Sequence, residues 1–130
     1  MAELDYAFIA EFAKVEGGKL TAIGASYISV SPPFFPAVHL LAIAGRVRAP
    51  EGTPGVDIEI GITLPKPGPG VSISATVGPD ENAEVYDGKI GILFAASTMV
   101  PLPGPGLVEV NLKVDGSHAR RLAFEVRAPA

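Results

Sequence analysis

Apolar and polar residues alternate along several stretches of this chain, and this alternation limits the fold more than any other feature. In the stretch 56–64, every even position is apolar and every odd position is polar or glycine. The stretches 71–77 and 108–114 alternate in the same way, and in 121–127 the large apolar residues fall at every second position. Because a period of two separates the two faces of a strand, each stretch predicts a β-strand with one buried and one solvated face.

Glycine and proline mark the connections between these stretches. The dipeptides Gly-Gly at 17–18 and Asp-Gly at 115–116 are typical of two-residue hairpin turns, and Asp-Gly at 87–88 marks a further turn or a strand start. Proline has no N–H to donate to a ladder. We therefore predict loops at the proline-rich segments, which are 32–33, 65–70 and 101–106.

These signals predict an all-β fold in a single domain, 1–130, of 130 residues. Regular short strands with glycine- and proline-rich turns favour an antiparallel two-sheet β-sandwich of about eight strands, immunoglobulin-like or similar. The predicted strands are 4–15, 19–30, 37–48, 56–64, 71–78, 88–99, 106–114 and 118–127. The first of them also fits a helix, because Leu4, Phe8 and Phe12 fall at helical spacing. We prefer the strand, since the turn at 17–18 leads directly into the next one.

The composition argues against several classes of function. With no cysteine, the chain has no disulfide framework, no thiolate metal site and no cysteine nucleophile. The net charge of −4 argues against nucleic acid or an anionic membrane as a partner. The start is acidic, and no apolar run approaches the roughly 20 residues of a membrane span. We therefore expect a cytoplasmic protein with neither nucleic acid nor membrane as its partner.

The residues that usually carry catalysis form no known pattern here. His39 lies within an apolar run, His118 follows a turn, and the two do not stand at metal-ligand spacing. The acidic residues at 80–84 lack the spacing of an EF-hand, and no tryptophan is present to support a sugar between paired carboxylates. We predict no catalytic residue, no cofactor and no metal, and therefore not an enzyme. An enzyme would require His39 or His118 to meet a carboxylate in a cleft.

Two stretches of the chain contain more apolar residues than a strand with one buried face requires. The runs 37–45 and 90–96 are apolar on both faces, as expected where both faces are covered. The mean hydropathy is +0.36 with only 18% charged residues, which is high for a small monomer. We predict a non-enzymatic protein-protein interaction or self-assembly protein, a homo-oligomer or a module docked on a larger protein. The predicted interface residues are Phe34, Phe35, Val38, Leu40, Leu93 and Ala95.

Two alternatives remain open. In the first, the chain is a monomer, and an N-terminal segment or a long loop covers the second face of the apolar strands. In the second, the chain is a small-molecule or polysaccharide-binding β-sandwich module that uses a concave sheet face near Tyr27, His39 and Tyr86. Clustering of these three side chains in a pocket would favour the second alternative.

Parts of the sequence resemble a known family. The residues that carry the resemblance are 2–10, 17–25, 35–37, 41–48 and 105–126. They look like a family of small uncharacterised all-β proteins of actinobacteria, a domain of unknown function, with the segments 2–48 and 105–126 most similar and 50–104 departing from it. The resemblance implies an all-β fold and an actinobacterial origin, and it implies no activity. The hairpin near the C-terminus also resembles the last hairpin of immunoglobulin-like modules, a likeness of fold alone.

Overall fold

The structure is a computed structural model that describes residues 2–65 and 70–129. These residues form ten strands in three sheets and no helix. One sheet has the order β1-β5-β8, with β1 (Glu3–Ala10), β5 (Ala37–Ala49) and β8 (Ile90–Leu102). A second has the order β4-β10-β9-β6-β7, with β4 (Ser29–Val30), β6 (Val56–Thr63), β7 (Val71–Val77), β9 (Gly106–Val114) and β10 (Ser117–Val126). A separate hairpin pairs β2 (Phe12–Glu16) with β3 (Lys19–Ile23).

The all-β prediction is confirmed, whereas the predicted eight strands in two sheets are replaced by ten strands in three. The difference arises mainly near the N-terminus, where the predicted strand 4–15 breaks at Glu11 and 19–30 breaks at 24–28. Gly24 and Ser26 both have a positive φ, which turns the chain out of the extended conformation. The N–H of Glu11 donates to the carbonyl of Ile23 (3.0 Å), and that of Ser26 donates to Ile9 (2.7 Å).

The predicted turns are found where glycine and aspartate mark them. At 17–18 and at 115–116, both central residues lie in the left-handed region, as a type I′ hairpin requires. The predicted loop at 101–106 is partly wrong, because Pro101 belongs to β8 and lies opposite Val38 of β5. Because β8 is the last strand of its sheet, a residue without an N–H is tolerated there. The predicted loop at 65–70 falls largely on residues 66–69, which lie outside the described part of the chain.

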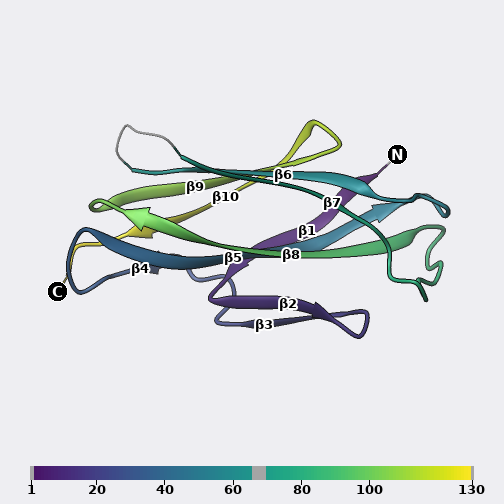
Figure 1. Cartoon of the computed structure of the whole chain (residues 1–130), viewed down its shortest axis with the longest axis horizontal. Coiled ribbons are helices and arrows are strands. Elements are labelled where there is room, and N and C mark those ends of the chain that lie inside the picture. Colours follow the sequence, from purple (N-terminus) through teal and green to yellow (C-terminus); the bar gives the residue numbers. More distant parts are fainter. Residues whose placement is uncertain (1, 66–69, 130) are drawn as a thin grey trace.

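The main core lies between the three-stranded and the five-stranded sheet. Alternate residues of each strand contribute to it, as the period of two predicts. Its largest fully buried side chains come from both sheets, among them Leu41, Ile43, Ile60, Leu112 and Phe124. Figure 1 shows the sheets as layers, with the β2–β3 hairpin on the far side of the three-stranded sheet.

This hairpin covers the outer face of the central strand β5. Ala42 and Ala44 of β5 are fully buried there with Ala10 and Ala13, and Phe8, Leu20 and Ala95 pack around them. Small side chains allow the hairpin backbone to approach the sheet closely. The middle of the run 37–45 is thus apolar on both faces because an N-terminal segment covers its second face. This is the covering that the first alternative above described, whereas the monomeric state in that alternative stays a prediction.

Candidate functional site

An apolar pocket lies between the last strands of the two large sheets. It has a volume of about 330 Å³ and is lined from β6, β7, β8 and the hairpin, by residues that include Val15, Ile60, Ile73, Val77, Leu93 and Ala95. The successive residues 93–96 of β8 line it, so both faces of this end strand contribute side chains to the pocket. The volume falls at the lower end of the range typical of small-molecule sites.

A larger polar groove of about 820 Å³ continues from this pocket. The two cavities share Val15, Gly78 and Leu93, so one cleft combines an apolar end and a polar end. The polar end runs between the hairpin turn and the segment 78–86, over Tyr6 and Arg46 of the three-stranded sheet. We call the two cavities together the cleft, and the side formed by β7 and β8 the cleft side.

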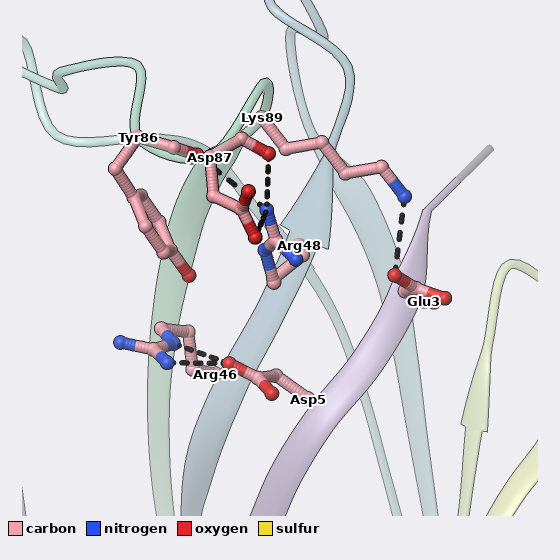
Figure 2. A network of polar contacts seen from close by, with 7 residues as sticks. All are labelled: Glu3, Asp5, Arg46, Arg48, Tyr86, Asp87 and Lys89. Atoms are coloured by element: carbon pink, nitrogen blue, oxygen red, sulfur yellow. Dashed lines mark hydrogen bonds and ion pairs between the residues drawn. The ribbon is translucent and has the colours of Figure 1, made fainter.

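Arg46 is held in place in the polar end. Its Nε and Nη2 both donate to Oδ2 of Asp5, at 2.8 and 2.5 Å (Figure 2). Its guanidinium also lies 5.0 Å from the ring centroid of Tyr6 and 5.4 Å from that of Tyr86, within the range of cation–π attraction. The hydrogen bond from Arg46 to Asp5 raises the pKa of the arginine above its usual value. The groove therefore contains a fixed positive charge, already paired with Asp5, between two tyrosines.

Two further cations fasten the turn that carries Tyr86. Nη2 of Arg48 donates to the carbonyl of Asp87 at 3.0 Å, and its guanidinium lies 4.9 Å from the Tyr86 ring centroid. Nζ of Lys89 donates to Oε1 of Glu3 at 3.1 Å (Figure 2). Because these contacts join the turn to both β5 and β1, they hold one wall of the groove against the three-stranded sheet.

The six predicted interface residues lie in three different places. Three of them are exposed, with relative accessible surface areas of 68% for Phe34, 64% for Val38 and 47% for Leu40. Val38 and Leu40 lie opposite Pro101 and Met99 on the outer face beyond the hairpin. Phe35 instead packs against the main core. Leu93 and Ala95 line the apolar pocket. Their predicted role as one interface stays a prediction.

The three residues predicted to gather in a ligand site do not all come together. The hydroxyl of Tyr27 lies 2.8 Å from Nε2 of His39, and both rings contact Phe124. Burial raises the pKa of Tyr27 to about 12 and lowers the pKa of His39. Tyr86 lies apart from them, in the polar groove. Sequence reasoning missed the pairing of Tyr86 with Arg46, because 40 positions separate them and no spacing rule links them.

Among the residues that the structure describes, no group of three or more histidine, cysteine, aspartate or glutamate side chains is arranged to hold a metal. His118, the other histidine considered above, lies on the exposed part of β10.

The strands at the ends of the sheets differ in how their outer edges are protected. Native proteins protect such edges with charges, bulges, proline or short length. β1 carries Glu3 and Asp5 and has an irregular register after Leu4, and β4 has only two residues. β8 has Pro101 near its end, but its residues 90–100 carry no charge, no proline and no register shift in the pairing with β5. β7 (Val71–Val77) has no charged residue, no proline and no register shift in its pairing with β6. In the described part of the chain it also has no second neighbouring strand.

Comparison with known proteins gives little guidance on function. No curated protein matches the sequence. Among solved structures, the alkylpurine DNA glycosylase AlkC of Pseudomonas fluorescens, bound to DNA containing an abasic site analog, is similar over 94% of this chain. The identity is 13% and the TM-score 0.48, and the match spans 30% of the glycosylase chain. A likeness this weak transfers no function to this chain.

This neighbour corrects one prediction made from the sequence. The predicted exclusion of nucleic acid is contradicted by this comparison and is not kept, because the solved structure found is a glycosylase bound to DNA. The exclusion was based on net charge, which averages over the whole chain and does not describe a local surface. The described residues include no helix long and apolar enough to cross a membrane. The cytoplasmic location stays a prediction.

The family match covers nearly the whole chain. The model of a family of unknown function, DUF6941, matches residues 5–127. This confirms the family of unknown function that the sequence resembled, and it extends through the middle segment 50–104, where the resemblance was weakest. The match does not show the actinobacterial origin, which stays a prediction. The chain belongs to the DUF6941 family.

Proposed function

We propose that this chain is a non-enzymatic interaction protein that acts in the cytoplasm and uses its cleft side. One observation carries the proposal: the unprotected edge of β7 lies directly beside a solvent-accessible apolar pocket. An unprotected edge is a hazard for a monomer, because its free N–H and C=O groups pair with any other exposed strand. The combination is readily explained if a strand from another chain normally occupies the edge.

Strand addition would use both parts of this surface. Main-chain hydrogen bonds to the edge supply affinity, and pockets for alternate side chains supply specificity. Ile73, Ala75 and Val77 of β7 line the apolar pocket. An added strand would therefore place every second side chain over this pocket. The exposed residues Val38 and Leu40, predicted from the sequence as interface residues, offer a further apolar contact area.

The test is capture of a partner by matched baits. The wild-type protein, Ser74→Lys and Thr63→Lys would each be immobilised and exposed to a lysate of the source organism. Ser74 and Thr63 are both exposed residues of the five-stranded sheet, but only Ser74 lies on the edge strand. We expect a stoichiometric partner, or a second copy of the chain, on wild type and Thr63→Lys and its loss on Ser74→Lys. Equal capture by all three baits, or no capture at all, would contradict the proposal.

A second candidate function is the binding of an amphiphilic small molecule, which was the alternative derived from the sequence. The observation that favours it is the continuity of the cleft, since an apolar end adjoins a polar end that contains Arg46, Tyr6 and Tyr86. A ligand with an apolar part and a polar part matches this division.

A further inference from the structure

We propose that the strand added to β7 is β7 of a second copy, paired antiparallel about a two-fold axis that passes through Ser74. This inference rests on the proposed use of the cleft side and names the partner. It follows from the backbone groups that β7 leaves free and from the order of its side chains.

The free backbone groups can be assigned from one reciprocal contact on β6. The N–H of Asp57 donates to Oδ1 of Asp115 (2.9 Å), and the N–H of Asp115 donates to the carbonyl of Asp57 (2.8 Å). Both backbone groups of Asp57 therefore point toward β9. Because backbone direction alternates along a strand, the odd residues of β6 point toward β9 and the even residues toward β7.

The register between β6 and β7 then identifies the free groups of β7. The even residues of β6 lie opposite odd residues of β7, as in Ile58↔Ala75 and Ile60↔Ile73. The odd residues of β7 therefore use their N–H and C=O groups in the ladder with β6. The even residues point theirs away from it, and these are Ser72, Ser74 and Thr76.

The side chains of β7 are arranged symmetrically about Ser74. In an antiparallel pairing centred there, Val71 lies opposite the second Val77, Ser72 opposite Thr76, and Ile73 opposite Ala75. Each apolar residue thus meets an apolar residue and each hydroxyl meets a hydroxyl, the kinds of cross-strand pair that stabilise sheets. A contact across a two-fold axis must be complementary to itself, and this segment meets that condition.

The same register uses all the free backbone groups. Ser74 exchanges both hydrogen bonds with Ser74 of the second copy, and Ser72 does so with Thr76. Val71, Ile73 and Val77 are only partly buried against the main core in one copy. The second β7 would extend their apolar face, so pairing would remove backbone groups and apolar side chains from water together. An unrelated strand could satisfy the same backbone groups, but nothing would fix its register at Ser74.

Cysteine cross-linking tests this register, because the chain has no cysteine of its own. Across the axis, the two Cα atoms of residue 74 would lie about 5.5 Å apart, a distance that a disulfide spans. The two copies of residue 72 would be offset by four strand positions, about 13 Å along the strand direction alone, which is too far for a disulfide. The double variant Ser72→Cys/Thr76→Cys brings a cysteine pair back into register.

We expect disulfide-linked dimers from Ser74→Cys and from the double variant under mild oxidation, and monomers from Ser72→Cys. Sedimentation of the wild-type protein should show twice the mass of 13.4 kDa at high concentration. Equal cross-linking of Ser72→Cys and Ser74→Cys, or a wild-type monomer at millimolar concentration, would overturn the self-pairing. If the protein is monomeric but a different protein is captured in a manner that Ser74→Lys abolishes, the interaction function stands and only the identity of the partner is wrong.

Discussion

The two sides of the molecule treat their exposed strand edges differently. On the side of β1 and β4, the edges carry acidic residues and a register irregularity, or are only two residues long. On the cleft side, β7 offers seven uncharged residues in regular extended conformation. Both sides belong to the same two large sheets, so the difference cannot come from fold class. We infer that the first side is built to face solvent and the second to face another strand.

The two sides also differ in how the neighbouring elements are fastened. Near the start of β1, Glu3 and Asp5 form ion pairs with Lys89 and Arg46, which bind β1 to β5 and to the turn before β8 (Figure 2). Arg46 also lines the polar end of the cleft, whereas the apolar end, beside β7, is lined mainly by apolar side chains. Solvent-exposed ion pairs contribute little to stability, usually below about 1 kcal/mol each. These ion pairs mainly fix the position of β1 relative to β5 and the turn before β8. The pocket beside β7 instead leaves apolar surface accessible to a binding partner.

The largest effect is expected from disrupting the close contact between β1 and β5 at Gly45. A Cβ atom there would lie 2.2 Å from the carbonyl oxygen of Tyr6 and 2.9 Å from the Phe94 ring, so Gly45→Ala must displace β1 from β5. We expect the free energy of unfolding to fall by at least ~2 kcal/mol. Gly61→Ala is the matched control, since a Cβ atom there meets nothing within 4 Å. Urea unfolding would measure both, and equal stability of the two variants would contradict the close packing of β1.

The next effect concerns the edge of β7. Ser74→Pro removes an N–H that we assign to the free edge and not to the ladder with β6, so the fold should persist while pairing weakens. We expect the dissociation constant for self-association to rise at least ~10-fold, which corresponds to 1.4 kcal/mol. Sedimentation measures the association, and circular dichroism checks the fold. Loss of the β-sheet signal in Ser74→Pro would show that this N–H is needed within the monomer.

A smaller effect is expected from filling the apolar pocket. Ala96 lines it, and Ala96→Phe would occupy part of its volume of about 330 Å³. Binding of the amphiphile 1-anilinonaphthalene-8-sulfonate, followed by its fluorescence, should weaken about fivefold, or ~1 kcal/mol. Ala128→Phe, at an exposed position after β10, is the control and should bind as the wild type does. If both variants bind alike, the dye is not held in the pocket.

The smallest effect is a pH dependence from the Tyr27–His39 contact, which joins the segment before β4 to β5. Burial lowers the pKa of His39, so the folded state binds fewer protons there than the unfolded state, in which histidine titrates near about 6.5. The stability is therefore complete above that pH and decreases as the pH falls through it. His39→Gln should remove this part of the decrease, and His118→Gln, at an exposed position, should keep it. Thermal unfolding at pH 5 to 8 would show the difference.

The strands with strict alternation were predictable from the sequence. β6, β9 and β10 each lie within a residue or two of the predicted bounds, because alternation records which face is buried. The same pattern does not record which sheet a strand joins. For that reason the segment 4–15 was predicted as one strand, although it is divided between the three-stranded sheet and the hairpin that covers it.

The candidate site was predictable only in part. Leu93 and Ala95 were singled out for their apolar run, and they line the cleft. The contact of Arg46 with Tyr86 was missed, because it depends on the tertiary packing of the turn before β8. The composition of β7 was visible in the sequence, but its significance depends on the sheet order, which places it at an end. Edge position is a property of the assembled sheet and is not recorded in local periodicity.

Hydrogen exchange at the amides of β7, followed by NMR at low and high protein concentration, tests the central claim most directly. The N–H groups of Ile73 and Ala75 belong to the ladder with β6 and should exchange slowly at both concentrations. We predict that those of Ser72, Ser74 and Thr76 exchange rapidly in dilute protein and become protected as the concentration rises. Rapid exchange of these three amides at every concentration would contradict the self-pairing of β7. Slow exchange in dilute protein would show that its edge is already occupied within one chain.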